Sequence, residues 1–170
     1  PGGVVVPSDV APPAWSSYCL CVGRLSQVQG VRVLARRAAG LPLVVVGDGP
    51  LREVLPQTVG FVPHDELGPY YERAAIVVVP SRREGYGVVA REGMAYGRAV
   101  VATAVGGLPD AIEHGVTGLL VPPGDRAGLR AALERLLGKE EGASADEEPA
   151  GDFEGLDFMP VMVGGFDDPP

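Results

Sequence analysis

Residues 76–103 read IVVVPSRREGYGVVAREGMAYGRAVVAT, and this stretch decides the fold class. Ile76–Val79 is apolar at every position, which suits a strand that is buried on both faces. A helix is predicted over Gly87–Tyr96, because a glycine follows it directly, and a second apolar strand is predicted over Ala99–Ala102. Apolar strands that alternate with helices are typical of a parallel sheet that helices cover on both faces.

The same alternation continues on both sides of this stretch. Further strands are predicted at Tyr18–Val22, Leu43–Val46, Val59–Val62 and Leu119–Val121. Helices are predicted over Val31–Ala39, Leu51–Leu55, Asp65–Ala74, Arg126–Leu137 and, as a single turn, Pro109–Glu113. The sequence therefore predicts an α/β fold with a Rossmann-like, doubly wound parallel sheet. Such sheets bind ligands at the carboxyl ends of their strands, where most of the glycines and polar loop residues of this chain fall.

Composition and charge divide the chain into three parts. Residues 1–14 are rich in Pro and Gly and are predicted to be a linker, residues 15–138 the folded domain, and residues 139–170 an acidic tail. The net charge of −8 comes from the tail, which holds ten acids and one base, whereas residues 1–138 hold 13 bases and 12 acids. A nearly neutral body lacks the basic face of a nucleic-acid-binding protein, so no nucleic-acid partner is expected.

The acidic tail also contains an apolar segment, residues 153–166, with three phenylalanines. Leaving these rings in water costs roughly 25 cal/mol per Å² of apolar surface. We therefore expect the segment to pack on the domain or to mediate self-association. The alternative, a tail without regular structure, stays open.

The cysteines point to a reducing compartment and not to a metal site. Cys19 and Cys21 are two residues apart on a predicted strand and so share one face, where an ordinary disulfide between them is geometrically unfavourable. Two thiols at this spacing, far in sequence from both histidines, make a poor zinc site. We expect two buried thiols, no metal and a cytoplasmic location.

Two loops at the carboxyl ends of predicted strands carry the candidate chemistry. Arg24 follows Gly23 after the first strand, where a glycine lets backbone approach a phosphate closely. Gly85 and Gly87 leave amide groups exposed at a helix start, which can hold a diphosphate or sugar hydroxyls. Glu84 would repel a phosphate, so a hydroxyl-rich group is expected beside it. Glu92 lies eight positions later and can accept hydrogen bonds from a ribose diol.

A purely structural role for Glu92 is the alternative. It could pair with Arg91 or Arg98 on a solvated face of the helix.

Longer motifs extend these single residues. Three motifs lie at the ends of predicted strands: Val22-Gly23-Arg24-Leu25-Ser26, Gly47-Asp48-Gly49-Pro50 and Gly60-Phe61-Val62-Pro63. They resemble the donor-binding half of family four glycosyltransferases, and so does nearly all of the stretch from Pro80 to Asp125. That stretch contains the two glutamates of the family, separated by seven residues. The resemblance covers about residues 16–138.

The resemblance implies a GT-B fold, of which this chain matches the carboxyl-terminal, donor-binding half. It implies a retaining transfer of a hexose from a nucleoside diphosphate sugar to an acceptor hydroxyl, with no metal ion or other cofactor. By this resemblance, Arg24 would bind the diphosphate, Glu84 would be the catalytic glutamate beside the transferred sugar, and Glu92 would bind the ribose. The sugar and phosphates would be contacted by the backbone amides of Gly85, Tyr86, Gly87 and Val88. The nucleobase would be contacted by the main chain of Phe61 and Val62.

The chain departs from the family pattern at Gln29, where the family has a lysine that contacts the diphosphate. Glutamine donates a hydrogen bond without charge, and charge-assisted bonds are roughly twice as strong. Whether Arg32 reaches in instead is left open. At Asp110 the family often has glutamate, a smaller change.

The family's amino-terminal, acceptor-binding domain is not matched, so it is expected as a partner in cis or in trans, and peripheral membrane association through it stays open. The isolated domain is expected to be inactive without it. One alternative is a non-catalytic nucleotide-sugar-binding module or one half of a split glycosyltransferase. A sugar-nucleotide epimerase would need catalytic acids from a second domain. An NAD-type oxidoreductase is disfavoured, because no G-x-G-x-x-G follows the first strand.

Overall fold

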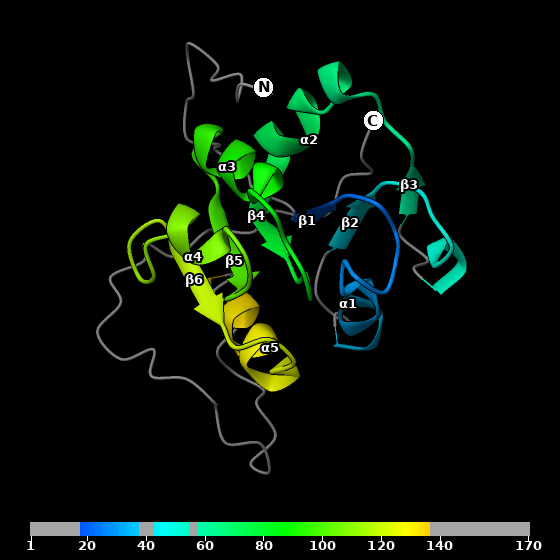
Figure 1. Cartoon of the computed structure of the whole chain (residues 1–170). Helices are drawn as coiled ribbons and strands as arrows, with labels where there is room; N and C mark the ends of the chain where they lie inside the picture. Colours follow the sequence, from blue (N-terminus) through cyan, green and yellow to red (C-terminus); the bar gives the residue numbers. More distant parts are fainter. Residues whose placement is uncertain (1–17, 38–42, 55–57, 137–170) are drawn as a thin grey trace.

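A computed structural model describes residues 18–37, 43–54 and 58–136 (Figure 1). The predicted linker 1–14 and the predicted tail 139–170 lie outside these residues. The described chain forms a parallel sheet of β1 (Tyr18–Val22), β2 (Leu43–Val46), β3 (Thr58–Gly60), β4 (Ala74–Val79), β5 (Ala99–Thr103) and β6 (Gly118–Val121). Its helices are α1 (Val31–Arg37), α2 (Gly68–Arg73), α3 (Val88–Ala95), α4 (Leu108–Ala111) and α5 (Arg126–Leu136), with 3₁₀ turns η1 (Arg52–Val54) and η2 (His64–Glu66).

Each face of the sheet has its own hydrophobic core, because successive strand residues point to opposite sides. Cys21, Ile76 and Leu119 face α1 and α5, in one cluster with Leu34 and Leu133. Leu20, Val77 and Val100 belong to the other cluster, together with buried residues of α2, α3 and α4. The predicted α/β fold with helices on both faces is confirmed.

The strand order is β3-β2-β1-β4-β5-β6, so the chain runs outward from the centre in two directions. The direction changes between β1 and β4, which pair with each other. In open parallel sheets the crevice at this point is the usual ligand site. The β1–α1 loop and the β4–α3 loop, which carry most of the candidate residues, flank it.

Two predicted boundaries are wrong for identifiable reasons. The strand predicted at Val59–Val62 ends at Gly60, whose φ of +100° turns the chain while its carbonyl accepts a hydrogen bond from the Gly47 amide. Phe61 and Val62 therefore lie in the following loop. The helix predicted over Asp65–Ala74 is split into η2 and α2, because Pro69 has no amide to continue a helix and instead begins one.

The two cysteines are both buried in the α1/α5 core, in agreement with their shared strand face. Burial raises the pKa of the Cys21 thiol to about 12. The Cys21 thiol is therefore protonated at pH 8, and a thiol reacts far more slowly than a thiolate. We expect both thiols to resist a disulfide reagent in the native protein at pH 8 and to react within minutes in concentrated urea. Rapid modification without denaturant would contradict this packing.

Candidate functional site

The β1–α1 and β4–α3 loops are fastened to each other through backbone. The Arg82 amide donates to the Val28 carbonyl at 2.8 Å. Gly30 has a φ of +67°, and a Cβ there would stand 1.9 Å from the Pro80 carbonyl oxygen. Only glycine allows this approach, so the sequence fixes the spacing of the two loops at the switch point.

The carboxylate of Glu84 lies in a short polar chain that includes Gln29. The Ser81 hydroxyl is buried and lies 3.1 Å from both Glu84 Oε2 and the Gln29 side-chain oxygen. A hydroxyl carries one proton, and a carboxylate is the stronger acceptor. Both oxygens lie where they can accept from the Ser81 hydroxyl, and the Glu84 carboxylate is the favoured acceptor of its one proton. Thr103 fixes the backbone beneath by donating to the Ser81 carbonyl.

The loop that contains Glu84 rests directly on the β5–α4 loop. The Gly107 amide donates to the Gly85 carbonyl at 2.9 Å. Gly106 has a φ of +54°, and a Cβ there would stand 1.7 Å from the Glu84 carbonyl oxygen. The backbone of residues 84–85 is thus held by main chain from a neighbouring strand, with no room for a side chain between them.

α3 begins with an uncapped, unopposed amino terminus. Its N-cap is Gly87, with a φ of +74°, which supplies no capping side chain, and no acid lies in the first turn. The first amides of the helix therefore have no capping side chain, and no acid in the first turn offsets their partial positive charge. This is the arrangement that suits a phosphate or sugar oxygen.

Glu92 is buried on the side of α3 that faces α2. The Tyr71 hydroxyl donates to Glu92 Oε2 at 2.7 Å, and His64 Nε2 lies 3.3 Å from Oε1. The pairing of Glu92 with Arg91 or Arg98 on a solvated face is wrong. Those guanidinium groups bind backbone carbonyls, Arg91 that of Tyr86 and Arg98 those of Tyr96 and Ala74.

Most of the remaining candidate residues are exposed, in the loops at the carboxyl ends of the strands. Phe61 is 77% exposed and Tyr86 59% exposed, with the Arg91 guanidinium 4.1 Å from the Tyr86 ring centre. Val88 is also exposed, whereas Val62 is half-buried against the α2/α3/α4 core. Arg24 is exposed and lines a small hollow together with Gln29. Exposed aromatic rings at a loop edge are the kind of surface that ligands cover.

Sequence reasoning missed three side chains that the structure adds to the site: Ser81, Tyr71 and His64. Ser81 lies three residues before Glu84, in the same loop, so its position could have signalled a contact. Tyr71 and His64 reach Glu92 from the segment between β3 and β4, and no local pattern encodes that approach.

Within the described ranges, no cluster of three or more His, Cys, Asp or Glu side chains is arranged to hold a metal ion. The same ranges contain no helix that is long and apolar enough to cross a membrane.

The sequence matches the family described as "Glycosyl transferases group 1" over residues 16–139. The chain belongs to this family. A D-inositol 3-phosphate glycosyltransferase of Mycolicibacterium smegmatis is 35% identical over 167 residues, which cover 85% of this chain and 38% of the relative. The chain spans about a third of the length of the curated relatives that it matches across most of its residues.

Solved glycosyltransferase structures share the fold. Sucrose-phosphate synthase from Thermosynechococcus elongatus superposes with a TM-score of 0.65 at 36% identity, covering 75% of this chain and 37% of that one. HepE of Anabaena, solved in complex with UDP and glucose, superposes with a TM-score of 0.62 at 25% identity, covering 71% of this chain and 39% of that one. The family match and these neighbours confirm a GT-B, Rossmann-like fold and the predicted resemblance to the carboxyl-terminal domain of such enzymes.

Proposed function

We propose that this chain is the donor-binding domain of a retaining glycosyltransferase that transfers a hexose from a nucleoside diphosphate sugar to an acceptor hydroxyl. One observation carries the proposal. Around the switch point the structure gathers an uncapped helix start, a loop carboxylate at Glu84 and a buried carboxylate at Glu92. These groups match, in order, a diphosphate, a sugar and a ribose.

In the proposed mode, the first amides of α3 and the Arg24 guanidinium bind the diphosphate and stabilise the charge that grows on it as the bond to the anomeric carbon breaks. Gly85 and Tyr86 lie beside the sugar, and Glu84, oriented by Ser81, accepts hydrogen bonds from its hydroxyls. Glu92, held by Tyr71, accepts from the ribose diol. Phe61 and Val62 contact the base. The Anabaena neighbour in complex with UDP and glucose supports this class of donor.

Acceptor binding is assigned to an amino-terminal domain, since the chain spans about a third of its relatives. The transfer forms a bond from the anomeric carbon to the acceptor oxygen and releases the nucleoside diphosphate and the hydroxyl proton. No metal ion or other cofactor is assigned to the domain, and a cytoplasmic location is proposed.

The experiment is a calorimetric titration of the chain with UDP, GDP, their glucose and mannose conjugates, and NAD. We expect saturable binding, at tens of micromolar or weaker, of at least one nucleoside diphosphate and its sugar, and none of NAD. Binding of NAD in preference to every diphosphate sugar, or of no member of the panel, would contradict the proposal.

Gln29 supports a second candidate, a domain that binds a nucleotide sugar without turning it over. Its neutral amide stands beside Arg24, and it already contacts Ser81. Addition of the amino-terminal domain of a related enzyme in trans distinguishes the two candidates: transfer to an acceptor supports the enzyme, and its absence with intact donor binding supports the module.

Replacing Gln29 by lysine should tighten UDP binding, because a second cation is added beside Arg24. The expected gain is roughly 1 kcal/mol, about fivefold in affinity, for a partly solvated site. Gln29→Met, which matches the length of the lysine without its charge, is the control. Calorimetry that finds no difference between the lysine and methionine variants would show that charge at this position does not matter.

A further inference from the structure

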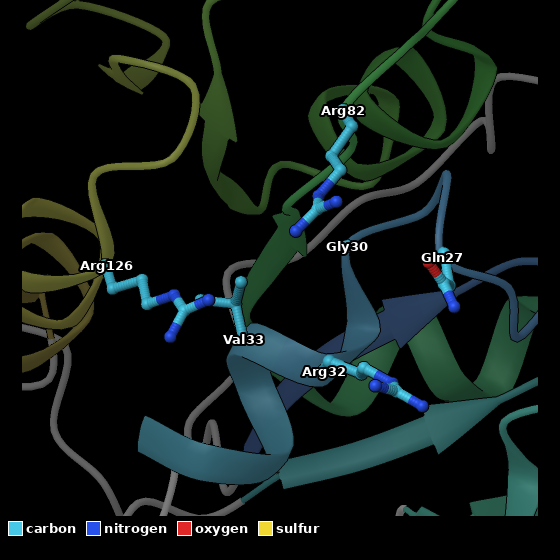
Figure 2. A pocket seen from close by; sticks show the side chains of 6 residues that line it. All are labelled: Gln27, Gly30, Arg32, Val33, Arg82 and Arg126. Carbon is cyan, nitrogen blue, oxygen red and sulfur yellow. The ribbon is translucent and has the colours of Figure 1, made fainter.

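A second polar hollow lies on the α1/α5 side of the sheet edge, and none of the proposed donor-binding residues lines it. Its volume is about 130 Å³, and its lining is Gln27, Gly30, Arg32, Val33, Arg82 and Arg126 (Figure 2). We call it the arginine pocket. The hollow beside Arg24 and Gln29 shares no lining residue with it. The two hollows are therefore lined by different residues of the β1–α1 loop.

Three arginines from three separate elements line the arginine pocket, and Figure 2 shows that the Arg32 side chain extends away from the other two. Arg32 belongs to α1, Arg82 to the β4–α3 loop and Arg126 to the first turn of α5. Figure 2 shows Arg82 and Arg126 extending from their two elements toward the space between them. Among the residues that the structure describes, no carboxylate lines the pocket, and the first turns of α1 and α5 contain no acid.

None of these three side chains has a hydrogen bond or ion pair with another described residue, whereas Arg52, Arg91, Arg98 and Arg130 are all engaged. The nearest acid in sequence, Asp125, instead caps α5 by accepting from the Gly128 amide at 2.8 Å. Like charges that share one hollow repel each other, and a bound anion would remove that repulsion.

The pocket is also built on fixed backbone. Gly30 contacts the Pro80 carbonyl so closely that the start of α1 and the end of β4 keep their spacing, and the Arg82 amide is bonded to Val28. Two of the three guanidinium groups thus extend from elements that are fastened together. Guanidinium groups are forked donors that suit the oxygens of a phosphate group.

We propose that the arginine pocket binds a phosphate-class dianion, separately from the diphosphate of the donor. The ligand would carry a phosphate ester small enough for the hollow, with its oxygens on Arg82 and Arg126, and Arg32 would add positive charge to the wall of the pocket. This inference goes beyond the donor site and does not depend on it.

Calorimetric titration of the full chain with inorganic phosphate, at low salt and again at 150 mM salt, is the first test. We expect saturable binding with a stoichiometry of one, and at least a tenfold loss of affinity in Arg82→Gln and in the double variant Arg32→Gln/Arg126→Gln. Arg130→Gln removes the same charge from α5 but outside the pocket, and should stay within twofold of the parent. Equal losses in the Arg130 control, or no saturable binding, would overturn the proposal.

Competition with UDP distinguishes the two possible sources of the phosphate group. If the pocket is separate, phosphate affinity is unchanged when UDP is saturating, and UDP affinity is unchanged in the pocket variants. Displacement of phosphate by UDP, with matching loss of UDP affinity in Arg82→Gln, would make the arginines part of the donor site and overturn the proposal. Urea midpoints within the error of the parent confirm that the variants are folded.

Discussion

Gly106→Ala is expected to destabilise the domain by about 3 kcal/mol or more and to abolish binding of the donor sugar. The added Cβ would lie 1.7 Å from the Glu84 carbonyl oxygen, and Gly106 adopts a φ of +54° that alanine disfavours. The backbone at residues 84–85 must therefore move away from the β5–α4 loop. Urea denaturation measures the loss of stability, and calorimetry with a nucleoside diphosphate sugar measures the loss of binding.

Gly124→Ala is the control that separates the two effects of Gly106→Ala, the steric clash of the added Cβ and the strain of a positive φ. Gly124 has a φ of +83°, but a Cβ there would meet no atom within 4 Å. Its expected cost is about 1 to 2 kcal/mol, the strain alone, with donor binding retained. If both variants lose the same stability and both bind donor normally, the contact between Gly106 and Glu84 does not hold the loop.

Glu92→Gln is expected to lower UDP affinity about tenfold or more, because a ribose diol donates more strongly to a carboxylate than to an amide. Glutamine keeps an oxygen that can accept from the Tyr71 hydroxyl, so the packing of α3 on α2 is preserved. Glu84→Gln should leave UDP affinity within twofold and lower only the affinity for the sugar conjugate. Equal losses of UDP affinity in both variants would contradict the assignment of the two glutamates.

Tyr71→Phe tests whether UDP binding depends on the Glu92 carboxylate alone or also on its orientation by the Tyr71 hydroxyl. The variant removes the 2.7 Å hydrogen bond and leaves the carboxylate in place. We expect a smaller loss of UDP affinity than in Glu92→Gln. A loss as large as that of Glu92→Gln, with an unchanged urea midpoint, would mean that the orientation of the carboxylate by Tyr71 decides the binding.

The strands and their order in the chain could be predicted because every central strand is apolar throughout, and the glycine-rich loops between them mark where each strand ends. The sequence also predicts that Arg24 and Glu84, which follow β1 and β4, lie at one edge, since parallel strands present their carboxyl ends together. The end of β3 at Gly60 differs from the prediction, because the positive φ of a glycine leaves no signature in an apolar pattern.

The side-chain contacts within the site could not be predicted from the sequence, for a different reason. Tyr71 reads as an ordinary core aromatic, and its hydroxyl finds Glu92 only because α2 packs against α3. The arginine pocket likewise depends on α1 and α5 lying on the same face of the sheet. Such contacts follow from the packing of elements far apart in the sequence and not from any local pattern.

The frame of the site is made of glycine backbone at Gly30, Gly106 and Gly107, whereas the groups that would meet a ligand are exposed side chains such as Phe61 and Tyr86. Mutation can therefore act on the two independently. A substitution at an exposed side chain changes which ligand the site binds and costs little folding stability. A substitution at one of the framing glycines forces the backbone apart and destabilises the whole domain. Directed evolution of donor preference should accordingly draw its successful substitutions from exposed positions such as Phe61 and Tyr86 and leave the three glycines unchanged.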